Sequence, residues 1–217
     1  MLIDDYVADL SRTLRGPHGP KRDMVVEARH SLLDAAEAYQ AGGLDRTEAE
    51  RRAVAEFGAV GEIAPGFQEE LVICAGRRLA WLMFLSTPLI CLLWSLIWRA
   101  FPYDVNDWAN RPEWFVPVAR ALDILQILSG ALGAAALVAL RRRSRALPVT
   151  RGLAWYCWAF LVCSGLLSLA LTAGADGPQG FSDYLPGTLL ALTSWLFTLA
   201  QIYVAAQCQR LTRRLWA

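Results

Sequence analysis

The sequence predicts an all-α membrane protein, in which a small helical domain (residues 1–76) precedes a bundle of four membrane-spanning helices (residues 77–217). Two observations carry this prediction. Residues 1–76 hold 14 acidic and 8 basic side chains, a net charge of −6, whereas residues 77–217 hold 6 acidic and 13 basic ones, a net charge of +7. The basic part also contains four apolar runs long enough to cross about 30 Å of hydrocarbon.

The first helix of the N-terminal domain is predicted by apolar residues that recur at steps of three and four. These residues are Ile3, Tyr6, Leu10 and Leu14. The Gly-Pro-His-Gly-Pro segment at 16–20 ends this helix, because glycine and proline break helices. A second apolar stripe covers residues 21–40 and stops at Gly42 and Gly43, where glycine suits the left-handed end of a helix.

A third helix is predicted from Thr47, since the run Thr-Glu-Ala-Glu at 47–50 matches a capping box. In that motif Thr47 caps the helix and Glu50 reaches back to its start. A fourth stripe runs from Val60 to Leu71, with Pro65 predicting a kink or a late start. We expect this helix to continue without a linker into the first membrane span.

The four spans are predicted at about 79–98, 118–140, 152–173 and 187–207. Their flanking arginines set the orientation by the positive-inside rule. The arginines that flank one side are Arg77, Arg78, Arg141, Arg142, Arg143, Arg145, Arg151, Arg210, Arg213 and Arg214. The opposite side has only Arg99, Arg111 and Arg120. The rule therefore predicts a multi-pass membrane protein with both termini and the 141–151 loop in the cytoplasm.

Polar residues inside the spans give a second group of candidate residues. Asp123 is the only acid in the four runs. It is compatible with an interfacial carboxylate paired with Arg120, with a proton or cation site, or with contact to a partner or ligand. Ser194, Thr198 and Gln201 share one face of the fourth span, and Gly130, Gly133 and Ala134 give the second span a surface of small residues. Small and weakly polar faces of this kind favour packing between membrane helices.

The N-terminal domain carries many carboxylates on its predicted helices. The candidates for a partner-binding surface are Glu27, Asp34, Glu37, Glu48, Glu50 and Glu56. One interpretation is an ordinary solvated face, since these helices also carry arginines. The other is an acidic surface that engages a basic protein, such as a DNA-binding regulator. Direct binding of nucleic acid is disfavoured, because the segment outside the membrane is acidic.

Several short segments of this domain resemble the bacterial helical domain called HAAS, or permease prefix domain 1, which is common in actinobacteria. The segments are Glu27-Ala28-Arg29-His30, Leu33-Asp34-Ala35-Ala36-Glu37-Ala38-Tyr39, Gly43, Glu48-Ala49-Glu50, Ala53, Phe57-Gly58 and Ile63-Ala64. The resemblance covers about residues 2–76. It implies a cytoplasmic unit of three or four helices that precedes membrane helices, is associated with PadR-like transcriptional regulators, and serves signalling or docking. The membrane half matches no permease motif.

The chemistry of an enzyme is missing from the sequence. His18 and His30 are the only histidines, and no catalytic, metal-binding or cofactor-binding pattern accompanies them. The sequence therefore predicts a non-enzymatic docking protein that contacts membrane lipid and a cytosolic partner, and it is compatible with a homo-oligomer. Two alternatives remain: a small transporter or permease subunit, and a scaffold in division or envelope assembly whose 141–151 loop contacts anionic lipid.

Overall fold

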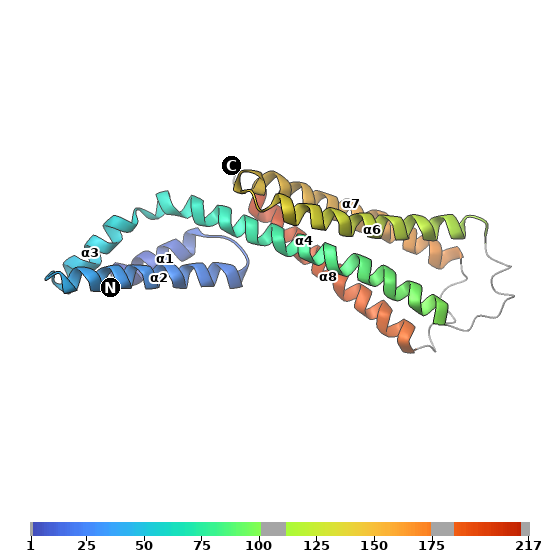
Figure 1. Cartoon of the computed structure of the whole chain (residues 1–217), viewed down its shortest axis with the longest axis horizontal. Helices are drawn as coiled ribbons and strands as arrows, with labels where there is room; N and C mark the ends of the chain where they lie inside the picture. Colours follow the sequence, from blue (N-terminus) through green and yellow to red (C-terminus); the bar gives the residue numbers. More distant parts are fainter. Residues whose placement is uncertain (1, 101–111, 175–184, 214–217) are drawn as a thin grey trace. The chain divides into compact units, whose positions relative to one another are not determined.

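The computed structural model of the chain describes residues 2–100, 112–174 and 185–213, and all regular elements in these ranges are helical. The prediction of an all-α fold is therefore confirmed. The elements are α1 (Leu2–Thr13), α2 (His18–Ala41), α3 (Arg46–Phe57), α4 (Val60–Ala100), α6 (Phe115–Ala139), the short 3₁₀ helix η1 (Arg143–Arg145), α7 (Ala146–Gly174) and α8 (Leu185–Arg213) (Figure 1). They form two compact units, one up to Ala75 together with the end of α8 from Leu211, the other from Gly76 to Arg210.

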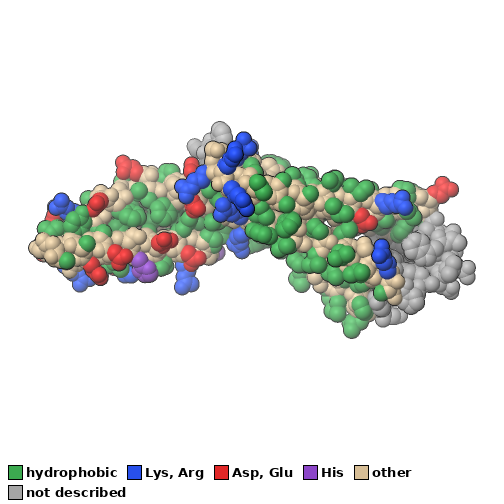
Figure 2. Space-filling model, viewed as in Figure 1, with side chains coloured by type: hydrophobic (Ala, Val, Ile, Leu, Met, Phe, Trp, Pro, Cys, Tyr) green, Lys and Arg blue, Asp and Glu red, His purple; other side chains and the backbone are tan. Residues whose placement is uncertain are grey.

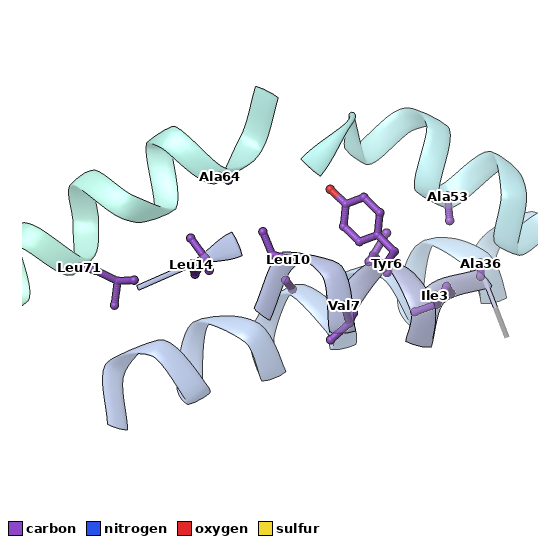
Figure 3. Packing of buried hydrophobic residues seen from close by; sticks show 11 residues of the cluster. Ile3, Tyr6, Val7, Leu10, Leu14, Ala36, Ala53, Ala64 and Leu71 are labelled. Atoms are coloured by element: carbon purple, nitrogen blue, oxygen red, sulfur yellow. The ribbon is translucent and has the colours of Figure 1, made fainter. Parts of the chain in front are cut away.

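The first unit packs α1, α2, α3 and the beginning of α4 around one apolar core. Leu10 of α1 and Leu14, which directly follows this helix, lie within this core, with Ala53 of α3 and Leu71 of α4 (Figure 3). The Tyr6 ring meets the Phe57 ring edge-on, with 5.9 Å between ring centroids, and its hydroxyl donates to the Gly58 carbonyl at 2.9 Å. The apolar stripe of α1 is thus the centre of this unit, as its spacing predicts.

Two loops of this unit depend on particular residues. The segment after α1 is fixed to α4, because the Gln68 side chain accepts from the Arg15 backbone N–H at 3.0 Å and donates to the Arg15 carbonyl at 2.7 Å. Gly43 and Gly58 follow α2 and α3 with φ angles of 97° and 101°. Residues with a Cβ rarely adopt such angles, so glycine at these two positions lets the chain leave each helix.

The start of α3 differs from the predicted capping box. Asp45 is the N-cap, and its Oδ1 accepts from the Glu48 backbone N–H at 2.9 Å. Thr47 therefore lies inside the helix, and Glu50 pairs with Arg46 instead of reaching back. An aspartate carboxylate is an effective cap because it is both a hydrogen-bond acceptor and a negative charge at the positive end of the helix dipole.

Substituting Asp45 by alanine is therefore expected to destabilise the first unit by about 1 kcal/mol, because one backbone N–H of α3 loses its acceptor. The matched control is Thr47→Ala, which removes the residue that the sequence pattern favours as the cap. Hydrogen exchange of the first-turn amides of α3 in the full-length protein measures both. Equal exchange in the two variants, or a larger effect of Thr47→Ala, contradicts the assignment of Asp45.

Helix α4 begins at Val60 and runs to Ala100 without interruption. The prediction that the fourth helix continues into the first span is confirmed, and the prediction of a late start at Pro65 is wrong. Pro65 lacks the N–H that would bond to the Gly61 carbonyl, but Gly61 is exposed and its carbonyl is open to water. The helix therefore tolerates proline in its second turn.

The second unit contains the rest of α4 with α6, α7 and α8. Four helices of the described chain are long and apolar enough to cross a membrane, as predicted. Hydrophobic side chains cover much of the face of this unit that Figure 2 shows. The exposed large apolar residues include Ile127 on α6, Leu166 on α7 and Leu196 on α8. A surface of this composition is unfavourable in water and suits the hydrocarbon of a bilayer. The chain thus has the make-up of a multi-pass membrane protein.

Candidate functional site

Polar side chains connect α4 to α8 inside the second unit. Gln201 is buried and its Nε2 donates to Ser86 Oγ at 2.9 Å. Further along α4, Trp94 Nε1 donates to Ser194 Oγ at 3.3 Å. Thr198 lies between these two contacts and its hydroxyl donates to the Ser194 carbonyl of its own helix at 2.9 Å. Two of the three polar residues predicted on this face of α8 therefore bind α4, and they fix the two helices in an antiparallel register.

Two glycines of α6 lie directly against α4. A Cβ at Gly133 would lie 2.8 Å from the carbonyl oxygen of Ala80 and 2.8 Å from the backbone nitrogen of Phe84. A Cβ at Gly130 would lie 2.5 Å from Cγ of Pro88. The backbones of α6 and α4 therefore touch where glycine leaves room, as in other small-residue contacts between membrane helices. The predicted packing role of Gly130 and Gly133 is confirmed.

Asp123 has a different neighbour from the one expected. Its Oδ1 accepts a hydrogen bond from the Cys91 thiol of α4, with 3.6 Å between sulfur and oxygen. No ion pair joins Asp123 to Arg120 among the described residues, so that prediction is wrong. The interpretations of Asp123 as a proton or cation site, or as a partner contact, stay predictions.

Eight of the predicted topology-setting arginines belong to the second unit and gather at one end of it. Arg77 Nη2 donates to the Leu140 carbonyl at the end of α6, at 3.4 Å, and Gly76 lies against Thr150 near the start of α7. The antiparallel register of α4 and α8 brings Arg210 to the same level. The described members are all exposed: Arg77, Arg78, Arg141, Arg142, Arg143, Arg145, Arg151, Arg210 and Arg213. Arg214 and Arg111 lie outside the described residues.

Three of the six predicted partner-binding acids form ion pairs or hydrogen bonds within the first unit. Glu50 is only 6% exposed and pairs with Arg46 at 3.3 Å, so little of it is open to a partner. Glu48 pairs with Arg51 at 2.6 Å, and this hydrogen bond holds the pKa of Glu48 below its usual value. Glu56 accepts from the Tyr39 hydroxyl, which raises the pKa of that tyrosine.

The other three acids form a stripe along α2. Glu27, Asp34 and Glu37 are exposed, and Asp23 and His30 fall on the same side at steps of three and four residues. We call these five residues the α2 acidic face. None of its four carboxylates belongs to an ion pair within the described part of the chain. Sequence reasoning missed Asp23, although its position four residues before Glu27 is the signal that identifies it.

The described residues contain no group of three or more side chains able to hold a metal ion. Comparison with known proteins adds no identity, because no protein-family model, curated protein or solved structure matches this chain. The resemblance of residues 2–76 to the HAAS domain therefore stays a prediction. The geometry of the α2 acidic face and of the membrane helices is therefore the basis for a functional proposal.

Proposed function

We propose that this chain is a non-enzymatic docking protein of the bacterial inner membrane, whose N-terminal unit binds a basic cytosolic protein through the α2 acidic face. The observation that carries the proposal is the row of four exposed carboxylates without ion-pair partners in the described chain. Elsewhere in the unit the acids at Asp4, Glu48 and Glu50 have arginine partners. An acidic row of this kind suits a positively charged partner.

The orientation in this proposal follows from the arginines. The end of the second unit that carries eight described arginines is taken as cytoplasmic, whereas Arg99 and Arg120 are the described arginines toward the other end. With that end in the cytoplasm, α4 enters the membrane from the same compartment that holds the α2 acidic face. A partner in the cytosol then has access to this face.

The partner that we favour is a PadR-like transcriptional regulator. A DNA-binding protein carries a basic surface for the phosphates of its operator, and the same surface is complementary to a row of carboxylates. Docking at the membrane would compete with DNA for that surface. The support for this choice is charge complementarity, together with the resemblance of the first unit to a domain associated with such regulators.

The test neutralises the α2 acidic face in the full-length protein with the triple change Glu27→Gln, Asp34→Asn and Glu37→Gln. We expect the Kd for a PadR-like regulator from the same genome to rise by about tenfold or more, which corresponds to about 1.4 kcal/mol. The difference should shrink as salt is raised, because exposed charges are screened. Binding is measured on protein held in lipid nanodiscs.

The matched control removes three exposed acids elsewhere in the same unit: Asp5→Asn, Glu62→Gln and Glu69→Gln. It changes the net charge by the same amount and leaves the α2 acidic face intact. Equal weakening by both triple variants would mean that only net charge matters, and an unchanged Kd in the first variant would exclude α2 as the docking face.

A further inference from the structure

Exposed aromatic residues accompany the arginines at one end of the second unit. On α4, Trp81 follows Arg77 by four residues, and on α7, Trp155 follows Arg151 by four. Both tryptophans are well exposed, at 51% and 54%. A spacing of four places each pair on one helix face, with the tryptophan about 6 Å nearer the middle of the unit.

Helix α8 repeats the arrangement in the opposite chain direction. It is antiparallel to α4, and exposed Tyr203 precedes exposed Arg210 by seven residues, which is two helical turns. On all three helices the arginine therefore lies at the end and the aromatic ring lies further in. The same order occurs on helices that run in opposite directions. It therefore reflects the layers of the membrane around the protein and not the direction of the chain.

Carboxylates are few in the described part of the second unit. Among the described residues from Gly76 to Arg210, the only carboxylates are Glu113 and Asp123. Glu113 precedes α6, and Asp123 meets Cys91, so both lie toward the opposite end from Arg77. Several guanidinium groups close together repel one another unless anions lie between them. An anion beside Arg77 or Arg151 would therefore reduce the repulsion among the arginines at this end of the unit.

Phospholipid supplies the chemistry that both residue types need. A guanidinium offers paired N–H donors that match two phosphate oxygens. An indole ring prefers the boundary between headgroups and acyl chains, where its N–H can meet an ester carbonyl. A phosphate ion from solution would use the arginine but leave the tryptophan without a role. The ordered pair of arginine outside and tryptophan inside thus favours lipid over a free anion.

We propose that this end of the second unit binds anionic phospholipid, with the lipid phosphates on Arg77 and Arg151 and the indoles of Trp81 and Trp155 against the ester region. The two pairs form two lipid sites, one on α4 and one on α7. This inference is independent of the docking function, because it uses no residue of the α2 acidic face.

The test uses the full-length protein in detergent, to which phosphatidylglycerol or phosphatidylcholine is added. Native mass spectrometry measures how much of each lipid stays bound. We expect phosphatidylglycerol to be retained preferentially and Arg77→Gln with Arg151→Gln to lower its retention about tenfold. Trp81→Leu with Trp155→Leu should lower retention as well, although every arginine is intact. Lysine at positions 77 and 151 should give an intermediate result, since the charge stays and the paired donors are lost.

The matched control is Arg99→Gln with Arg120→Gln, which removes two exposed arginines from the other end of the unit. It should leave retention of phosphatidylglycerol unchanged, and an equal loss would mean that net charge alone attracts the lipid. The proposal is overturned if the two lipids are retained equally, or if inorganic phosphate alone stabilises the protein against heat as well as phosphatidylglycerol does. If the glutamine variant does not fold, unchanged retention in the lysine and leucine variants overturns it instead.

Discussion

Replacing Gly133 by leucine is expected to separate α6 from α4 and to lower the thermal stability of the membrane unit by about 3 kcal/mol or more. Overpacking costs about 1–3 kcal/mol even where neighbouring side chains can move. Here the obstacles are backbone atoms of Ala80 and Phe84, each 2.8 Å from the position of a new Cβ. Neither can move without shifting α4 itself. Thermal unfolding of the protein in detergent measures the loss.

The control for this substitution is Gly165→Leu on α7, which adds the same side chain at a helical glycine. No atom lies within 4 Å of a Cβ at Gly165, so the added side chain meets open space that lipid or detergent occupies. We expect its unfolding temperature to stay close to that of the unchanged protein. If Gly133→Leu unfolds at the same temperature as Gly165→Leu, α6 and α4 do not meet at this glycine.

Truncating Leu10 to alanine is expected to destabilise the first unit by about 2–5 kcal/mol. Leu10 is 0% exposed in the core shared by α1, α2, α3 and α4, so the lost methyl groups leave a cavity. A loss of about 2 kcal/mol corresponds to hydrogen exchange on the order of 30-fold faster for the core amides of α2. The measurement is made on the full-length protein, because exchange reports on this unit separately from the membrane helices.

Leu2→Ala provides the comparison within the same helix. Leu2 is 44% exposed, and its truncation removes the same atoms with little loss of burial. We expect its effect to stay within about 0.5 kcal/mol. Similar exchange rates in the two variants would show that α1 does not pack through Leu10, and the arrangement of the first unit would then be wrong.

The four membrane helices could be predicted because the pattern that identifies them, a long apolar run, lies in a continuous stretch of sequence. A run of about 20 apolar residues is required by the thickness of the bilayer and needs no knowledge of contacts. The apolar stripe of α1 could also be predicted, because Tyr6 and Leu10 are spaced at the helical period. The continuation of α4 could be predicted because no glycine- or serine-rich linker precedes Arg77.

The remaining features depend on which of several competing local contacts forms. Asp45 and Thr47 can each cap a helix, and the choice between them rests on where the turn after Gly43 ends. Glu50 looks like any surface carboxylate in the sequence, but the rotation of α3 buries it beside Arg46. Asp123 has Arg120 one turn away, yet its partner is Cys91 on another helix. Sequence spacing shows which contacts are possible within a helix and leaves the neighbouring helix unspecified.

The hydrogen bond between Gln201 and Ser86 has a consequence for biogenesis. The two residues are 115 positions apart, so the ribosome releases α4 long before α8 is made. In the meantime the Ser86 hydroxyl donates to the Leu82 carbonyl at 2.6 Å, so the early span can enter lipid with that donor already satisfied. Gln201 brings an amide that hydrocarbon does not satisfy, and the span already in place supplies its acceptor. A later span therefore takes a hydrogen-bond acceptor for its buried amide from a span that entered the membrane before it.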